Sequence, residues 1–409
     1  MREHTRIYQH LFSKTNSTII SSVGTAAART AAMAAVKWTN MVGKKRTPVA
    51  LEIAENRLQN ICSYDENSSL PSIPYCHDDE DKNDGLIDVS VIVPVHNGEK
   101  YLAECMNSIF NQAGDYFMQL IVINDHSTDL SPQILAELQN KFPFDVYVPE
   151  NGGSAGRARN EGLRHATGRY VIFVDCDDVL PPNAIRELYE EIEYCHADIV
   201  QGSWKYLQDD GRGSTQYFWP HQFKDYRTNS DRMQLPGMPW GKIYRRTLFD
   251  RIRFPESVPC YEDAIIHNII FSRAKEIRTI GNIVYEWRRN PNGLTSSTQG
   301  TERGVNAYWV TKEIVKYRHD AGLTADDLWY RNLTLQLSCY CYPCVREMTG
   351  DRRQKVFDAC CALYRQEFHN ETIGAWFMAN QIERWAAKAL ETGNYKLWEL
   401  CGRFYPILM

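Results

Sequence analysis

The sequence contains no long hydrophobic run, and this absence excludes one class of protein. Hydrophobic residues make up 43% of the 409-residue chain. None of them form a stretch of about 18 uncharged apolar residues, the usual minimum for a membrane-spanning helix. We therefore expect no transmembrane helix. The chain is long enough for two or three domains with buried cores, so a globular protein is expected.

The chain also lacks a large excess of charge of one sign. Its 46 basic and 51 acidic side chains leave a formal net charge of -5. A broad nucleic-acid-binding surface needs a strong excess of lysine and arginine. Nucleic acid is therefore not an expected partner.

The 12 cysteines do not have the spacing of a disulfide framework. Most stand singly, which is typical of thiols in a reducing compartment, so we expect a cytoplasmic protein. Cys339, Cys341 and Cys344 could suggest a zinc site, but no second pair follows at ribbon or finger spacing. We favour buried thiols for these three.

Acidic residues are absent between Glu3 and Glu52, whereas basic residues occur throughout this segment. Residues 21–38 are rich in alanine, which favours a helix. The segment could lie on an anionic membrane surface, act as a targeting peptide, or form an accessory or poorly ordered segment. The small alanine side chains favour the last of these. We place a basic helical extension at residues 1–63 and an acidic linker at residues 64–86.

Strands and helices are predicted to alternate from residue 87 to residue 202. Helical segments with apolar residues at a 3.6-residue spacing separate apolar, β-branched runs, and Asn97 is placed to cap the first helix. Short connections between such elements are typical of a doubly wound, mostly parallel α/β sheet. The predicted strands are residues 88–94, 119–123, 144–148, 170–174 and 198–202.

Polar side chains follow several of these strands. His96 follows the first, Asp125 follows the second, and Asp175 and Asp177 follow the fourth. Open α/β sheets bind ligands at the carboxyl ends of their strands. Asp175 and Asp177 are two positions apart, so they project to the same side of an extended segment, and two hard oxygen ligands suit Mg²⁺ or Mn²⁺ with substrate phosphates completing the shell. Taken alone, the pair could equally be a solvated acidic turn.

Residues 152–153 are both glycine and precede a helix predicted to start at Ser154. Glycine lets the backbone approach a ligand, and the first N–H groups of a helix attract anions. Arg157 or Arg159 could add a charge-assisted contact to a diphosphate. A dinucleotide-binding loop is the competing interpretation, but its fingerprint belongs at the first strand-to-helix turn, which is residues 95–98 here. An ordinary turn with surface arginines remains the alternative.

Four segments of this region occur in order and together resemble a known family. They are Val89-Ser-Val-Ile-Val-Pro-Val-His-Asn-Gly-Glu-Lys-Tyr-Leu102, Val122-Ile-Asn-Asp-His-Ser-Thr-Asp129, Ala158-Arg-Asn-Glu-Gly-Leu163 and Tyr170-Val-Ile-Phe-Val-Asp-Cys-Asp-Asp178. This series resembles the nucleotide-sugar half of the family 2 inverting glycosyltransferases, which have the GT-A fold. The resemblance covers roughly residues 88–298, and we place a GT-A domain at residues 87–300.

The resemblance implies roles for individual residues. Asp175 and Asp177 would form the Asp-x-Asp metal and ribose site with Mn²⁺ or Mg²⁺, Asp178 would support them, and Cys176 and Arg159 would lie beside the donor. His96 stands where the family often has tyrosine or threonine, and this change should not abolish binding. The residues implied to line the nucleoside pocket are Pro94, His96, Asn97, Glu99 and Asp125.

Two downstream segments, residues 238–248 and 259–271, continue the resemblance. Glu262 and Asp263 open a predicted helix at the end that favours anions. The resemblance implies that this pair is catalytic, with Asp263 as the general base, because inverting transfer needs a carboxylate beside the acceptor hydroxyl. Without the upstream motifs, ordinary charge at a helix start would explain the pair.

Four further residues are candidates near the acceptor and the diphosphate. Trp240 and Trp287 could stack on a sugar ring, although a core role suits them equally. Arg288, or Arg289 beside it, lies in a segment that resembles the loop closing the domain, which implies a contact with the diphosphate. No Gln-x-x-Arg-Trp motif follows. That motif is typical of processive synthases of the family, so we expect a single transfer per encounter.

Residues 301–409 are predicted to form a helical domain rich in aromatic residues. These aromatics either pack that domain or meet lipid or a lipid-linked acceptor. The second alternative would add a peripheral membrane surface as a partner, on the inner face of the cell membrane. The predicted helices are residues 308–317, 328–348, 354–368, 373–389 and a last one from 395.

The sequence thus predicts a metal-dependent inverting glycosyltransferase of cell-envelope polysaccharide synthesis. It would move a sugar from a nucleotide-sugar donor, expected to be a UDP-sugar, to a hydroxyl of a glycan or lipid-linked glycan. A non-catalytic nucleotide-sugar-binding module is the alternative, but it would not need Asp263. A nucleotidyltransferase would begin its sheet with a Gly-rich loop containing Lys or Arg, which residues 92–97 lack.

Overall fold

The chain forms two compact units in a computed structural model. The sheet unit is Glu66–Gly293, and the helical unit combines Met1–Asp65 with Leu294–Met409. Among the described residues, every helix is too short or too polar to cross a membrane. The structure describes residues 33–34, 39, 48–64, 86–207, 216–217, 224–226, 232, 235–288, 290, 301–323, 327–368 and 381–408.

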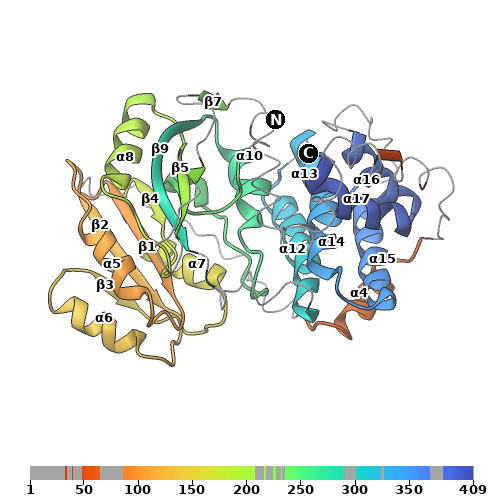
Figure 1. Cartoon of the computed structure of the whole chain (residues 1–409), viewed down its shortest axis with the longest axis horizontal. Helices are drawn as coiled ribbons and strands as arrows, with labels where there is room; N and C mark the ends of the chain where they lie inside the picture. Colours follow the sequence, from red (N-terminus) through yellow and green to blue (C-terminus); the bar gives the residue numbers. More distant parts are fainter. Residues whose placement is uncertain are drawn as a thin grey trace, which may run out of the picture. The chain divides into compact units, whose positions relative to one another are not determined.

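The described strands of the sheet unit form one nine-stranded sheet in the order β3-β2-β1-β4-β8-β5-β9-β7, with β6 paired to β5. The strands β3, β2, β1 and β4 are mutually parallel, β8 is antiparallel to β4 and β5, and β5 and β9 are parallel again (Figure 1). The bounds are β1 Val89–Val95, β2 Met118–Asn124, β3 Asp145–Tyr147, β4 Tyr170–Phe173, β5 Ile199–Leu207, β6 Gln216–Tyr217, β7 Lys224–Tyr226, β8 Lys242–Arg245 and β9 Ile277–Arg288.

The predicted alternation of strands and helices is confirmed in the first half of this sheet. All residues of β1 and β4 are buried, as their unbroken apolar sequences require of strands covered on both faces. The helix α7 packs against β1 and β2, and α8 packs against β5 and β9. The helices are α5 Leu102–Phe110, α6 Ser131–Gln139, α7 Ala155–His165 and α8 Ala184–Cys195.

The predicted cap of the first helix is wrong. The helix α5 begins at Leu102 with Tyr101 at its N-cap position, and no side chain caps it. Asn97 has a left-handed backbone with φ 52°, and its side-chain oxygen accepts from the Thr128 N–H at 2.8 Å. Asn97 therefore ties two loops together instead of starting the helix, because asparagine tolerates this conformation better than most residues.

The helical unit is built from both ends of the chain. The helix α4, Leu51–Gln59, packs against α15, and the Tyr308 hydroxyl donates to Glu55 at 2.7 Å. The part of the N-terminal extension that is described is thus an accessory element of this unit, while most of the predicted helix at 21–38 lies outside the described residues. The remaining elements are η5 Glu302–Val305, α12 Asn306–Asp320, α13 Asp327–Leu335, η6 Gln336–Tyr340, α14 Cys341–Val345, α15 Gly350–Glu367, α16 Gln381–Thr392 and α17 Tyr395–Leu408.

Aromatic side chains fill the core of the helical unit. Trp309, Trp329 and Trp398 are among the largest fully buried side chains of the described residues. These three therefore pack the domain, which is the first of the two alternatives for the C-terminal aromatics. The thiols of Cys341 and Cys360 lie 3.9 Å apart in the same interior, and Cys339 and Cys344 are buried as well.

A buried ion pair inside the helical unit yields a stability prediction. Arg331 donates to both carboxylate oxygens of the fully buried Glu383, at 2.9 and 2.7 Å. Replacing Glu383 with alanine leaves the guanidinium of a side chain that is 11% exposed without this partner, so we expect the free energy of unfolding to fall by about 3–5 kcal/mol in urea denaturation. The double variant Arg331→Met/Glu383→Leu should regain most of that loss. A loss below about 1 kcal/mol in the single variant, the scale of an exposed pair, would contradict the assignment.

Candidate active site

The parallel register brings the polar strand ends to one edge of the sheet. Val95 at the end of β1 is in register with Asn124 at the end of β2, and the Asp125 N–H donates to the Val95 carbonyl at 2.8 Å. On the other side of β1, the Val174 N–H donates to the Ile92 carbonyl at 3.0 Å. The loops that carry His96, Asp125 and Asp175 therefore leave the sheet side by side, as the sequence predicted.

The side of this edge that was predicted to bind the nucleoside is organised around Asp125. Both of its carboxylate oxygens accept from the Gly153 N–H at 3.0 Å, and its backbone carbonyl is 2.7 Å from His96 Nδ1. A Cβ on Gly152 would lie only 2.5 Å from Asp125 Oδ1, so only glycine fits there. Ser154 caps α7 by accepting from the Arg157 N–H at 3.2 Å. The predicted glycine turn and helix start are thus part of this edge.

The other residues predicted to line the nucleoside pocket differ in how deeply they are buried. Pro94 is buried inside β1, whereas His96, Asn97 and Glu99 are exposed. Glu99 accepts from the Leu130 N–H at 3.0 Å and so anchors the loop that precedes α6. Their contact with a nucleoside stays a prediction.

Three aspartates crowd the loop after β4. Asp178 is almost fully buried and accepts from the Tyr285 hydroxyl and from the Arg288 N–H, both at 2.7 Å. The same hydroxyl accepts from the Asp175 N–H at 3.1 Å, and Asp177 accepts from Asn290 at 3.0 Å. Asp178 therefore supports the loop from within, as expected, whereas the contact of Asp175 and Asp177 with a ligand stays a prediction.

The electrostatics of this loop suit a cation. Burial, followed by the charge of Asp175, raises the pKa of Asp177 above its ordinary value. Burial and the two neighbouring carboxylates raise the pKa of Asp178 still further. Crowded, partly desolvated carboxylates destabilise one another, and a divalent ion would relieve that repulsion.

The donor set of Asp175 and Asp177 fits Mg²⁺ or Mn²⁺, which prefer hard oxygen ligands. Within the described residues, no group of three or more histidine, cysteine, aspartate or glutamate side chains is arranged to hold a metal. The two aspartates would therefore need oxygens from water or from substrate phosphates to complete a coordination shell. This is the usual arrangement for Mg²⁺ in proteins.

Arg159 joins this aspartate loop to the predicted catalytic pair. Its guanidinium, only 4% exposed, donates to Asp175 Oδ1 at 2.8 Å and to Glu262 Oε1 at 2.5 Å. Burial lowers the pKa of Arg159, but the Asp175 and Glu262 carboxylates more than offset that effect, so its net pKa is raised. A permanently charged side chain thus links the two halves of the site.

Asp263 lies next to this ion pair, at the start of a helical segment. It is half-buried, and helical residues 264–265 lead from it into the π-helix η4, Ile266–Ile270. Burial, then the neighbouring Glu262 carboxylate, raises the pKa of Asp263 to about 7, although Arg159 acts in the opposite direction. A general base works best with a pKa near the working pH. Glu262 itself is buried and bound to Arg159, so it acts on the pKa of Asp263 from the protein interior.

The structure places Trp240 in the interior. It is 6% exposed, and its ring stacks on that of Tyr285 at 4.5 Å between centroids. Trp287 is half-buried and is the more accessible of the two tryptophans. Its ring centroid lies 6.3 Å from that of Trp240. The core alternative thus describes Trp240 better than sugar stacking does, because its ring face is already covered.

Two other predicted donor contacts also have structural partners. Arg288 is 6% exposed; it donates to Glu104 at 2.5 Å and to the Asp177 carbonyl at 2.8 Å, so it braces the aspartate loop. Cys176 is close-packed: its Sγ would lie 3.1 Å from a Cβ on Gly98. Their contacts with a donor stay predictions, and Arg289 lies outside the described residues.

Sequence reasoning missed Tyr285 and Glu104, which hold the aspartate loop in place. No motif marks Glu104, which is one acidic residue on a helix surface. Tyr285 could have been found, because it alternates with Trp287 on a predicted strand and so shares its face.

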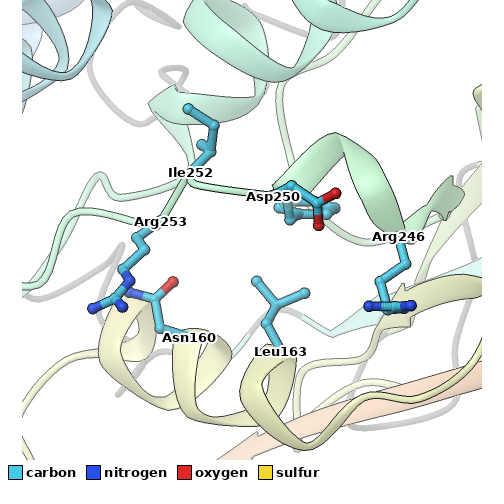
Figure 2. A pocket seen from close by; sticks show the side chains of 7 residues that line it. Asn160, Leu163, Arg246, Asp250, Ile252 and Arg253 are labelled. Atoms are coloured by element: carbon cyan, nitrogen blue, oxygen red, sulfur yellow. The ribbon is translucent and has the colours of Figure 1, made fainter. Parts of the chain in front are cut away.

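A pocket lies elsewhere in the sheet unit, at the other end of β4. Its empty volume is ≈ 290 Å³, including open solvent, and it contains none of the predicted site residues. Arg246 follows Arg245, which is in register with Tyr170 at the start of β4, whereas Asp175 follows the end of that strand. Figure 2 shows the labelled side chains around it; the lining residues are Asn160, Leu163, Arg246, Phe249, Asp250, Ile252 and Arg253.

Comparison with known proteins identifies the domain. Residues 90–253 match the family model described as "Glycosyl transferase family 2"; the match ends before Glu262 and Asp263. Glycosyltransferase GlyG of Streptococcus pneumoniae is 29% identical over 223 residues, which are 50% of this chain and 72% of that protein. Poly(ribitol-phosphate) beta-N-acetylglucosaminyltransferase TarS of Staphylococcus aureus is 30% identical over 214 residues, or 51% of this chain.

The chain spans only part of several curated relatives. The aligned segment is 36% of TarS and 33% of Glycosyltransferase GlyA of Streptococcus pneumoniae. Among solved structures, S. aureus TarS 1-349 in complex with UDP-GlcNAc has a TM-score of 0.63 at 23% identity, covering 78% of this chain and 91% of that one. Residues 90–253 therefore form a domain of glycosyltransferase family 2, and the sheet unit has the GT-A fold.

Proposed function

We propose that the protein is a metal-dependent inverting glycosyltransferase with Asp263 as its general base. One observation carries the proposal: Arg159 binds Asp175 and Glu262 at the same time, so the predicted donor side and the predicted catalytic pair belong to one site. The donor would be a UDP-sugar, and the solved complex of TarS with UDP-GlcNAc supports that choice.

The acceptor would be a hydroxyl of a glycan or lipid-linked glycan of the cell envelope. Two relatives support a polymer of this kind by their names, the poly(ribitol-phosphate) transferase TarS and the minor teichoic acid biosynthesis protein GgaB of Bacillus subtilis. We therefore use poly(ribitol phosphate) as the first acceptor to test, with water as a second, unspecific acceptor.

The donor would be held by the strand-end loops. Asp125 is fixed by Gly153 and would accept from the nucleoside, and the N-terminus of α7, capped by Ser154, would favour the negative charge of the diphosphate. Asp175 and Asp177 would hold Mn²⁺ or Mg²⁺, which when bound neutralises the negative charge developing on the leaving diphosphate. Arg159 keeps Asp175 in place from the protein side.

Asp263 would take the proton of the acceptor hydroxyl as that oxygen attacks the anomeric carbon. Attack from the face opposite the departing diphosphate inverts the configuration at that carbon. Glu262 assists indirectly, because its carboxylate raises the pKa of Asp263 and so makes Asp263 a stronger base. A nucleotide-sugar-binding module would not need this arrangement.

Replacing Asp263 with asparagine is expected to lower the rate of UDP release by about 10²-fold or more, because the base is lost. The affinity for UDP, measured by calorimetry, should stay the same. Asp351→Asn is the matched control, since Asp351 is exposed in the helical unit and pairs with Lys355. An unchanged rate in Asp263→Asn would mean that another group is the base; UDP binding by the wild type without any UDP release would favour a binding module.

The rate should depend on pH through Asp263. Because its pKa is raised to about 7, the deprotonated base is present above pH 7 and is lost as the pH falls below it. We expect kcat to fall about tenfold per pH unit on the acidic side. Glu262→Gln removes the carboxylate that raises this pKa, so its acidic limb should move to lower pH. A limb at the same pH in both proteins would refute the electrostatic role of Glu262.

A further inference from the structure

The turn at residues 235–241 lies beside the candidate active site, and buried side chains hold it on its inner side. Three of them bind backbone carbonyls of this turn: His267 from η4, and Lys242 and Tyr244 from β8. Because each donor is buried, the carbonyls of the turn point into the protein. The turn is therefore fixed by contacts on its inner side, and residues 236–238 are the part of it that is only half-buried.

Two glycines make this close packing feasible. Gly241 has φ +70°, a conformation that other residues rarely adopt. A Cβ on Gly237 would lie 2.9 Å from Nδ1 of His267, so a larger residue would push the ring away. The shape of the turn thus depends on specific contacts on its inner side.

The turn connects the two halves of the site. Trp240 stacks on Tyr285, whose hydroxyl donates to Asp178 at 2.7 Å, so this part of the turn rests on the support of the aspartate loop. Lys242 follows the turn, and the charged group that acts on it is Asp263. The turn therefore has links both to the aspartate loop and to Asp263.

Lys242 is an unusual residue to find in this position. It is 1% exposed, and its ammonium donates to the carbonyls of Met238 at 2.6 Å and Trp240 at 3.5 Å. Within the described part of the chain, no carboxylate forms an ion pair with it. Burial lowers the pKa of Lys242 to about 7, against the influence of Asp263. A buried charge without an ion pair is costly, and an apolar side chain of similar length would fill the space at lower cost.

We propose that Lys242 is a positioning residue for the transfer. Its ammonium holds the carbonyls of Met238 and Trp240, fixes the 235–241 turn where the acceptor binds, and presents a positive charge to Asp263. The inference rests on the proposed function, since it assigns this turn to the acceptor side. It goes beyond that function by separating a group that orders the acceptor site from the groups that bind the donor.

The charge of Lys242 should lower the pKa of Asp263. Four charged groups act on or beside Asp263: Glu262 on its own segment, Arg159 on α7, Asp175 after β4 and Lys242 on β8. Arg159 and Lys242 favour the deprotonated base, whereas the two carboxylates oppose it. Removing the lysine charge should therefore shift the acidic limb of kcat to higher pH.

The test compares Lys242→Met with the wild type in UDP release from UDP-GlcNAc, with Mn²⁺, and with poly(ribitol phosphate) or water as the acceptor. We expect an unchanged Kd for UDP, a KM for the polymer raised at least tenfold, and an acidic limb moved to higher pH with either acceptor. Lys275→Met is the control, because Lys275 is exposed and precedes β9 at the far end of the sheet. The same KM and the same limb as the wild type would overturn the proposal.

A second variant covers the case in which Lys242→Met does not fold. Tyr244→Phe removes the hydroxyl that donates to the Pro239 carbonyl at 2.9 Å and leaves all charges in place. It should raise the acceptor KM without moving the pH limb, and an unchanged KM would overturn the role of the turn. A wild-type protein that binds UDP but gives no UDP release would instead overturn the proposed function, and with it the role of Lys242.

Discussion

The site depends on one buried cation. Arg159 brings a charge into the protein interior, which costs several kcal/mol unless partners compensate, and its partners are Asp175 and Glu262. These two carboxylates come from a strand end and from a loop more than eighty residues downstream. The arginine therefore specifies how α7, the aspartate loop and the catalytic segment fit together. The glycine turn before α7, with Asp125 on the Gly153 N–H, sets the position of that helix.

Carboxyl pKa values are raised on both sides of this arrangement. In the aspartate loop, crowding and burial raise the pKa values of Asp177 and Asp178, a cost that a bound cation would relieve. At Asp263, burial and Glu262 raise the pKa to about 7, which gives a base matched to neutral pH. In the proposed function, the first cluster would hold a cation and Asp263 would take a proton.

Local patterns predicted the strands and the order of the site, whereas long-range contacts did not follow from them. The apolar runs of β1 and β4 and the supporting place of Asp178 were predictable, because strand periodicity and motif order are local properties. The role of Asn97 was not predictable, because its backbone is left-handed and its side chain accepts a hydrogen bond from Thr128 in another loop. The burial of Trp240 and Lys242 was not predictable either, because the motif that contains both does not indicate which side chains are buried. The packing of α4 against α15 joins parts of the chain about 300 residues apart, beyond any sequence window.

The proposed function depends above all on a divalent ion at Asp175 and Asp177 that helps this domain to hold a nucleotide-sugar. Calorimetric titration of the full chain with UDP-GlcNAc, first with Mn²⁺ and then after its removal by a chelator, measures this dependence. We predict binding at least tenfold tighter with Mn²⁺, because the ion removes the repulsion between the aspartates and the diphosphate. Equal affinity with and without Mn²⁺ would contradict the metal site.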